Sequence, residues 1–416
     1  MKGLIQVFLF LLSYSVISQT LEEIQTAQIV AGRVNASWAR SQPYVIMISI
    51  DGFRYDYADK YGASNILRLR KKGASTSKMI SCFPSKTFPN HYSLVTGLYP
   101  GNHGIVLNDF YSRSRDEWYN KKKRSTVEDG SWYGGVPLWS LAEQHGMLSA
   151  SFFWVGSAAE IAGYRPNYTY QYNESVPNDL RIDQVIRWLE LPDSLRPHFI
   201  TTYFSIVDQM GHLLGTSNEG VKKAVLEVDQ QIGKLSHFID KSELPINLII
   251  VSDHGMADIS RGIVLEDIVH LGNSKVNYST PTHIYNDNSD EVERMYSELK
   301  DNKLLSVYKR DQLPDRYHYL NTDRVGDLVL VSTPPLIILE KEKRVSGGTH
   351  GFDPIAIDEM GAFFVINGPD IKENYQMDPF ENIHVYPLVA RLLGLNVTDI
   401  DGDPEILNPI LSQEYK

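Results

Sequence analysis

The chain has 416 residues, of which 42% are hydrophobic and 22% charged, so its composition is that of a folded globular protein and not of a disordered one. Its formal net charge of −11 at pH 7 excludes a broad basic face, and with it a nucleic-acid duplex or an anionic membrane as the main partner. An anionic substrate would therefore need cations concentrated at one place.

The first twenty residues, MKGLIQVFLFLLSYSVISQT, contain a predicted signal peptide at residues 1–18. Lys2 precedes an apolar run from Gly3 to about Leu12, which is short for a membrane span, and small residues follow it. We expect cleavage after Ser18 and an exported mature chain, periplasmic or secreted, with no membrane span. The alternative is an uncleaved N-terminal anchor.

The single cysteine, Cys82, cannot form an internal disulfide. Exported enzymes of this size from animals usually contain disulfides, whereas bacterial periplasmic enzymes often do without them. The cysteine content therefore favours a bacterial periplasmic protein.

Four apolar runs rich in β-branched or aromatic residues predict strands at residues 44–50, 198–207, 246–252 and 361–367. None alternates cleanly between apolar and polar residues, which is typical of strands buried on both faces. Residues 178–191 and 219–239 have apolar positions at helical spacing and predict helices. This alternation predicts an α/β doubly wound fold, with a central, mostly parallel sheet flanked by helices.

Acidic residues and histidines follow three of the predicted strands. Asp51 follows the first strand. Asp208 and His212 come at the end of the second, and Asp253 and His254 follow the third. Ligands bind outside the carboxyl edge of an open α/β sheet, so these side chains can converge although they are far apart in the sequence.

A sixth side chain, His350, lies in the glycine-rich stretch SGGTHGF, which can bend close to the others. Three Asp and three His offer oxygen and nitrogen without sulfur, a set that suits Zn²⁺ and suits Mn²⁺ or Fe²⁺ less well. Six protein ligands are too many for one tetrahedral catalytic ion with an open position, but they fit the two ions used in phosphoryl transfer. For any one of these motifs alone, the alternative is a helix cap or a salt bridge.

The sequence becomes more polar between His254 and His350. Residues 286–289 indicate a turn, and residues 290–300 predict a short amphipathic helix. We interpret residues 258–345 as a smaller lobe, inserted into a single domain at residues 19–412, whose return delivers His350.

Six short motifs follow one another from about Tyr44 to about Leu393: SIDGFR, KTFPNH, GLYPGNHGI, DQMGH, SDHGM and GTHG. Together they resemble the nucleotide pyrophosphatase/phosphodiesterase family of the alkaline phosphatase superfamily. The motifs are specific in combination, and the resemblance covers nearly the whole mature chain.

The resemblance implies two zinc ions per chain, each held by a separate set of side chains. One set is Asp208, His212 and His350, and the other is Asp51, Asp253 and His254. It also implies that Thr87 bridges toward the second ion and is the nucleophile, so that a phosphothreonine forms. A threonine hydroxyl is a poor nucleophile at neutral pH, and no His-Asp dyad closely follows Thr87, so activation by metal is the economical explanation.

The resemblance further implies that the Thr87 backbone N–H and Asn108 donate hydrogen bonds to the phosphate oxygens. It places Phe88 and Tyr172 on the two faces of a nucleobase, with Trp154 nearby. The alternatives are a turn-forming role for Asn108 and ordinary core or surface packing for the three aromatic residues.

The predicted function is hydrolysis of a small-molecule nucleotide or another phosphodiester by a two-zinc phosphodiesterase or nucleotide pyrophosphatase. Within the superfamily, the alternatives are a phosphomonoesterase and a diesterase acting on lipid headgroups. Monoesterases often have an arginine where this chain has Phe88, which favours a diester. No oligomeric state is predicted.

Two more distant alternatives are a sulfatase and a non-catalytic binding protein. Residues 82–86, CFPSK, are close to the sulfatase signature Cys-x-Pro-Ser-Arg, but Lys86 replaces the arginine and Thr87 is left unexplained. A small apolar packing role is the simpler interpretation of Cys82. The complete ligand set together with Thr87 argues against a binding protein.

Overall fold

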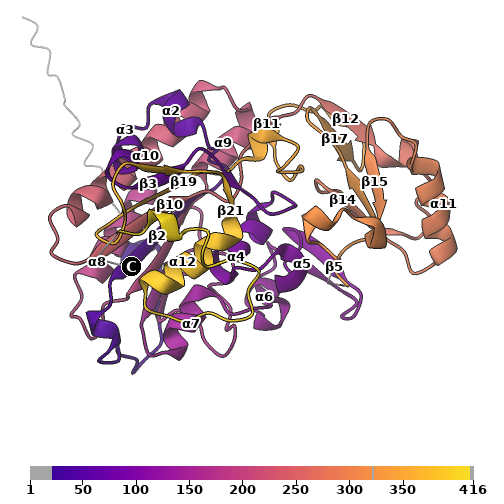
Figure 1. The fold of residues 1–416 in the computed structure, drawn as a ribbon. Coiled ribbons are helices and arrows are strands. Elements are labelled where there is room, and N and C mark those ends of the chain that lie inside the picture. The colour runs from indigo at the N-terminus through magenta and orange to yellow at the C-terminus, as the bar shows by residue number, and fades with distance from the viewer. Residues whose placement is uncertain (1–20, 321–322, 413–416) are drawn as a thin grey trace, which may run out of the picture.

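The computed structural model describes residues 21–320 and 323–412 (Figure 1). The predicted signal peptide, at residues 1–18, lies outside the described residues. Among the described residues, no helix has both the length and the apolar character that crossing a membrane requires.

A mixed nine-stranded sheet lies at the centre of the described chain, in the order β1-β8-β7-β9-β2-β10-β19-β3-β20. Strands β8, β7, β9, β2 and β10 are parallel neighbours, whereas β19 is antiparallel to both β10 and β3. The bounds are β1 Gln28–Ile29, β8 Tyr168–Thr169, β7 Ser149–Phe152, β9 Phe199–Phe204, β2 Tyr44–Ile50, β10 Ile246–Val251, β19 Phe364–Asn367, β3 Ala74–Thr76 and β20 Tyr375–Met377. The predicted α/β fold with a mostly parallel central sheet is confirmed.

The central strand β2 explains why the predicted strands do not alternate between apolar and polar residues. All of its residues are buried. Val45 and Met47 belong to the core on one face of the sheet, and Ile46 and Ile48 to the core on the other face. Because side chains alternate between the two faces, a strand covered on both sides must be apolar throughout.

Helices cover both faces of the sheet (Figure 1). One face packs against α3 (Ser64–Lys72), α8 (Asn178–Leu189) and α10 (Glu219–Ile239). The other packs against α4 (Thr87–Thr96), α7 (Leu138–Gln144) and α12 (Val385–Leu392). The amphipathic patterns at residues 178–191 and 219–239 therefore correspond to real helices, which bury their apolar stripes on the sheet.

Three predicted strands are longer than the observed ones, the one at residues 246–252 by a single residue. The predicted strand at residues 198–207 ends at Phe204, and α9 (Ile206–Leu214) begins two residues later. Its apolar residues continue into the first turn of the helix, so hydropathy alone could not locate the boundary. The predicted strand at residues 361–367 begins only at Phe364 in the structure. Ala362 forms isolated bridges with Arg54 and Met79 instead.

Residues 261–339 form a separate group of elements at one end of the molecule (Figure 1). Strands β12 (Arg261–Val264) and β17 (Leu336–Leu339) pair in parallel. A four-stranded sheet has the order β13-β14-β16-β15, with β13 Lys275–Asn277, β14 Thr282–Tyr285, β16 Leu328–Val331 and β15 Ser306–Lys309. Helix α11 (Ser289–Leu299) lies within one residue of the helix predicted at residues 290–300. The domain boundaries themselves stay a prediction.

A hairpin of β5 (Asp109–Ser112) and β6 (Glu117–Asn120) contacts this lobe, and its first strand begins directly after Asn108. Lys275 of the lobe donates a hydrogen bond to the Tyr111 hydroxyl at 2.9 Å, and Asn277 donates one to the backbone carbonyl of Asp109. Arg113 of the hairpin forms an ion pair with Asp327 of the lobe. The lobe is therefore fixed to the segment that follows Asn108.

Candidate active site

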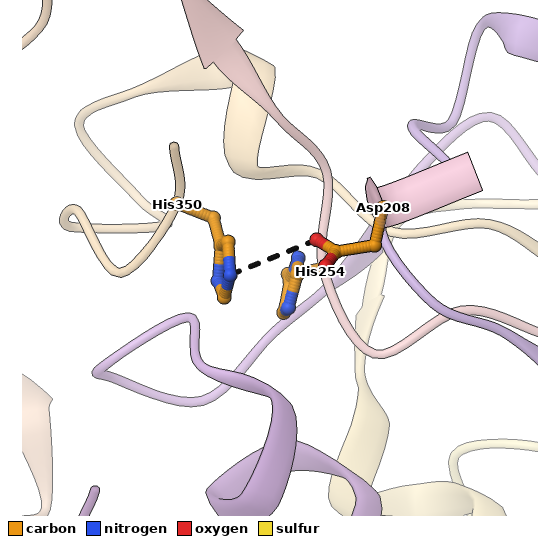
Figure 2. A group of neighbouring side chains, drawn as sticks. All are labelled: Asp208, His254 and His350. Carbon is orange, nitrogen blue, oxygen red and sulfur yellow. Dashed lines mark ion pairs between the residues drawn. The ribbon is translucent and has the colours of Figure 1, made fainter. Parts of the chain in front are cut away.

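Potential metal ligands converge at the carboxyl edge of the central sheet. Asp51, Asp253 and His254 form one cluster, and Asp208, His254 and His350 form another, in each of which the ligand atoms lie within 4.8 Å of one another. Figure 2 shows the second cluster, where His350 Nε2 lies 3.7 Å from Asp208 Oδ1. The strands β9, β2 and β10 are adjacent in the sheet, which is why residues so far apart in the sequence meet here.

Three carboxylate oxygens in these clusters are buried without a hydrogen-bond donor: Asp51 Oδ1, Asp208 Oδ1 and Asp253 Oδ2. Burial, followed by the charges of Asp253 and Asp208, raises the pKa of Asp51 well above its usual value. Burial also acts to raise the pKa of Asp253, but the neighbouring His254 and His91 lower it. Unpaired carboxylates this close together are costly unless cations lie between them.

The three histidines are held in the tautomer that a metal ligand needs. Nδ1 of His254, His350 and His212 lies 2.8–2.9 Å from the backbone carbonyls of Gly255, Ser85 and Gly348, respectively. A carbonyl can only accept, so each Nδ1 carries a proton, and whenever the ring is neutral its lone pair is on Nε2. Those Nε2 atoms face carboxylate oxygens, at 2.9 Å in the case of His254 and Asp253. Lone pairs that face carboxylates fit bound divalent cations.

His212 lies at the rim of the site. Its position four residues after Asp208 in α9 puts both side chains on one helix face, with Nε2 3.4 Å from Asp208 Oδ1. Its side chain is 40% exposed, and its ring centroid is 5.0 Å from that of His350. His254, whose ring stacks on that of His350 at 3.6 Å, stands between the two clusters. The structure thus brings all six predicted ligands together, with His254 close to both sets.

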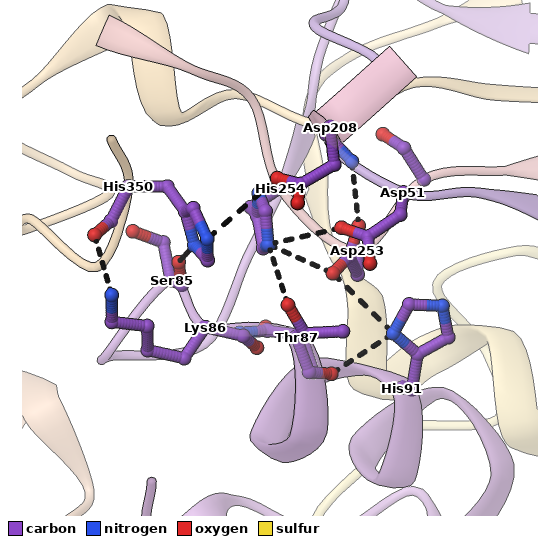
Figure 3. A network of polar contacts seen from close by, with 12 residues as sticks. Asp51, Ser85, Lys86, Thr87, His91, Asp208, Asp253, His254 and His350 are labelled. Carbon is purple, nitrogen blue, oxygen red and sulfur yellow. Dashed lines mark hydrogen bonds and ion pairs between the residues drawn. The ribbon is translucent and has the colours of Figure 1, made fainter. Parts of the chain in front are cut away.

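Thr87 is the first residue of α4, and its Oγ1 lies 3.4 Å from His254 Nε2 (Figure 3). The first N–H groups of a helix have no partner within the helix, and they favour an anion at that end. The predicted nucleophile therefore faces the shared histidine from a helix end suited to a phosphate group.

The two residues before Thr87 hold the loop that carries His350 (Figure 3). The Ser85 carbonyl accepts from His350 Nδ1 at 2.8 Å, and the Lys86 ammonium donates to the His350 carbonyl at 2.9 Å. The Ser85 hydroxyl donates to the Phe352 carbonyl at 2.8 Å and accepts from the Gly351 N–H at 3.1 Å. One set of contacts thereby positions both the predicted nucleophile, Thr87, and the predicted metal ligand, His350.

Lys86 itself is buried, and burial lowers the pKa of its ammonium group to about 7, with a further contribution from the charge of Lys121.

Gly351 has a φ of +104°, and a Cβ there would lie 1.9 Å from the Thr280 carbonyl. Glycine is therefore required for the loop to pass this close to Lys86 and Thr280.

His91 contributes to the site although its sequence motif gave it no ligand role. Its Nδ1 lies 2.9 Å from the Thr87 carbonyl and 3.3 Å from Asp253 Oδ2, and its Nε2 lies 2.7 Å from the Ser49 hydroxyl. Its position one helical turn after Thr87 was the signal that could have identified it. Tyr203, which donates to Asp51 Oδ2 at 2.5 Å, gave no such signal because it lies within an apolar strand.

Asn108 and Phe88 lie together beside Thr87. The Asn108 side-chain oxygen accepts from the Phe88 N–H at 2.8 Å, so the amide group of Asn108 is held at the N-terminus of α4. The Phe88 ring is partly buried, with its centroid 6.2 Å from that of Tyr119 in an edge-on arrangement. The Asn108 side chain is therefore anchored to the first turn of α4, beside Thr87.

The other two predicted substrate-contacting aromatics differ in exposure. Tyr172 is 54% exposed, with its ring 5.0 Å from Phe153 and 6.2 Å from Tyr203. Trp154 is 6% exposed, and its indole N–H donates to the His91 carbonyl at 2.9 Å. Burial favours a packing role for Trp154 beneath α4, whereas Tyr172 is open to a ligand.

Cys82 is buried and donates to the Asn382 side-chain oxygen at 3.0 Å. Burial raises the pKa of its thiol, so the reactive thiolate is disfavoured. The residue behaves as a small core side chain, and the geometry gives the sulfatase alternative no support.

Comparison with known sequences matches residues 45–353 to the family described as type I phosphodiesterase/nucleotide pyrophosphatase. Human ectonucleotide pyrophosphatase/phosphodiesterase family member 1 is 36% identical over 388 residues, which cover 89% of this chain and 42% of that protein. Venom phosphodiesterase 2 of Crotalus adamanteus is 31% identical over 395 residues, covering 90% of this chain and 48% of that protein. The chain spans less than half the length of these curated relatives.

Among solved structures, murine ectonucleotide pyrophosphatase/phosphodiesterase 5 superposes with a TM-score of 0.84 at 29% sequence identity. The match covers 89% of this chain and 100% of that one. A second structure of the murine protein is an inactive threonine-to-alanine variant in complex with AMP.

The hydroxyl of Ser85 generates a first prediction. Ser85→Ala removes the contacts to Gly351 and Phe352, so we expect the divalent-ion affinity of the predicted site that contains His350 to fall by about tenfold or more. Titration calorimetry of chelator-treated protein with Zn²⁺ measures this. Ser93→Ala is the matched control, because the buried Ser93 hydroxyl lies in the helix that follows, α4, and contacts His103, at 3.0 Å. Equal affinities for both variants would show that Ser85 does not position His350.

Proposed function

Because the chain belongs to the type I phosphodiesterase/nucleotide pyrophosphatase family, we propose that it hydrolyses phosphodiester or phosphoanhydride bonds of nucleotides or related diesters. Thr87 is the nucleophile in this proposal, and two zinc ions are the cofactors. The observation that carries it is the position of Thr87 Oγ1 at a helix N-terminus, 3.4 Å from His254 Nε2. The inactive threonine-to-alanine variant of the murine relative, bound to AMP, supports both the nucleophile and the nucleotide.

The residues would hold the two ions in two sets, with Asp51, Asp253 and His254 in one and Asp208, His212 and His350 in the other. Bound divalent ions would supply Lewis acidity, which lowers the pKa of a hydroxyl group and offsets negative charge. Three ionised Asp and a threonine alkoxide would balance two divalent cations, so the loaded site would be close to neutral and could accept a phosphodiester anion. The buried, unpaired carboxylate oxygens support this assignment.

The chemistry at Thr87 proceeds by two displacements at phosphorus. Thr87 Oγ1 forms a bond to phosphorus while the bond to the leaving oxygen breaks, which gives a phosphothreonine and releases an alcohol or a phosphate. Water then attacks the phosphorus, the bond to Oγ1 breaks, and the threonine is regenerated. The Thr87 N–H and the Asn108 amide donate to the non-bridging oxygens, where negative charge accumulates.

A nucleobase would lie between Phe88 and Tyr172. The exposure of Tyr172 supports this placement, and the buried Trp154 would support the helix beneath the nucleotide. Stacking is tolerant of base identity because every base presents a π-face. The proposed substrate class is therefore nucleotide esters without a fixed base preference.

Export of the chain to the periplasm or outside the cell is part of the proposal. The predicted signal peptide and the names of the venom and ectonucleotide relatives support it.

The test of the nucleophile is release of nitrophenol from the p-nitrophenyl ester of a nucleoside 5′-monophosphate by zinc-loaded protein. We expect Thr87→Ala to lower the rate by at least about 10³-fold, because the covalent route is lost. A chelator should abolish the wild-type rate, and Zn²⁺ should restore it. p-Nitrophenyl phosphate and p-nitrophenyl sulfate serve as comparison substrates, and faster turnover of either would replace the diesterase assignment.

Asn108 provides a separate test of phosphate stabilisation. Asn108→Ala should lower kcat by about 10²-fold, the usual effect of losing one donor to a developing oxyanion. Thermal unfolding measured on the same sample separates this effect from loss of the contact with the Phe88 N–H. An unchanged kcat in a folded variant would remove Asn108 from the reaction.

Tyr172 tests recognition of the base. Tyr172→Ala should raise KM for nucleotide esters more than KM for bis(p-nitrophenyl) phosphate, because only the nucleotide carries a base to stack. Tyr172→Phe keeps the ring and should leave both constants close to wild type. Equal effects of the alanine substitution on both substrates would contradict stacking.

A further inference from the structure

Residues 121–124 form a basic run, Lys-Lys-Lys-Arg, in a chain whose formal net charge is −11. The run follows β6 directly, and all of its residues are exposed. Lys123 pairs with Glu117 at 3.5 Å, and Arg124 pairs with Glu128 at 2.7 Å. Two adjacent exposed lysines in this run, Lys121 and Lys122, thus have no carboxylate partner among residues 21–320 and 323–412.

The hairpin places this pair beside Asn108. In the antiparallel register of β5 and β6, Asp109 lies opposite Asn120. Asn108 immediately precedes Asp109, and Lys121 immediately follows Asn120, so Lys121 lies across the hairpin from Asn108. The Lys121 backbone N–H donates to Asp109 Oδ1 at 3.0 Å, which fixes the chain at this point.

The same hairpin runs beside Phe88. Tyr119, two residues before Lys121 in β6, has its ring centroid 6.2 Å from that of Phe88. Asn108 in turn accepts from the Phe88 N–H at 2.8 Å. The two lysines therefore extend from a strand that is anchored to the residues proposed to hold the scissile phosphate and the base.

We propose that Lys121 and Lys122 form a subsite for a second phosphate group of the substrate, beyond the phosphate that is cleaved. This inference rests on the proposed function and deepens it, because it names multiply phosphorylated nucleotides as the favoured substrate class. Lysine binds phosphate as a point charge on a flexible stem, and the exposed setting makes the attraction sensitive to salt. The second phosphate is carried either on the ribose or in the leaving group.

Two matched pairs of substrates distinguish these positions. Coenzyme A and dephospho-coenzyme A differ only in a ribose 3′-phosphate, and ATP and ADP differ only in one phosphate of the leaving group. The measurement is the ratio of kcat/KM within each pair, for the wild type and for the double variant Lys121→Met/Lys122→Met. The control is Lys300→Met/Lys303→Met, which makes the same change in net charge at the end of α11.

We expect the double variant to lower the preference for the more phosphorylated member at least fivefold in one pair, and the pair affected identifies where the phosphate binds. High salt should lower the same ratio in the wild type. The control variant should keep the wild-type ratios. Ratios unchanged by Lys121→Met/Lys122→Met in both pairs would overturn the subsite.

Equilibrium binding of the same four compounds to the Thr87→Ala chain tests the subsite without turnover. An affinity preference for the more phosphorylated member that depends on Lys121 and Lys122 supports it, and equal affinities within both pairs overturn it. Failure of the wild type to hydrolyse any of the four compounds would count against the proposed function, while these affinities still decide the subsite.

Discussion

The crowding of three carboxylates at adjacent strand ends is the constraint on which the rest of this structure depends. Asp51, Asp208 and Asp253 each have a buried oxygen without a hydrogen-bond donor, and three histidines present Nε2 lone pairs to the same space. Such an arrangement is unfavourable in a chain without bound cations. The surrounding contacts, from Tyr203 to Asp51 and from His91 to Asp253, keep the carboxylates in place. The protein thus stores electrostatic repulsion that cations would relieve.

His254 connects the two halves of this arrangement. Its Nε2 lies close to Asp253, Asp51 and Thr87, and its ring stacks on that of His350. The segment before Thr87 is bonded in turn to the loop that carries His350. A displacement of either Thr87 or the loop that carries His350 would therefore affect the other. This mutual dependence explains why Ser85 and Lys86, which are not ligands, are buried against that loop.

Much of the fold could be predicted because its signals are local and strong. The β2 and α10 bounds agree with the predicted segments, since a fully apolar run and a long amphipathic stripe are each distinctive. The end of β9 was predicted wrongly because its apolar run continues into α9. The short strands of the lobe, such as β13 and β15, are partly exposed and gave no clear pattern.

In the candidate site, too, some features could be predicted from the sequence and others could not. The six predicted ligand residues and Thr87 were identified from motifs, and strand order explains why they lie close together. The contacts of Ser85 and Lys86 were not predictable, because hydrogen bonds to backbone carbonyls far away in the chain depend on loop paths that residue types do not specify. For Trp154 the neighbouring motif was not sufficient. An aromatic residue near a motif can lie in the core or at the surface, and only the burial seen in the structure distinguishes the two.

The bond between Lys86 and the His350 carbonyl joins residues 264 positions apart in the chain. Contacts of such long sequence separation form late in folding, because the entropy of closing the intervening loop must be met before they contribute. During synthesis the first two strands and α4 leave the ribosome long before His350 does. The proposed ion site is therefore completed only after His350 has emerged, so ion binding would report that the segments around Thr87 and His350 have come together.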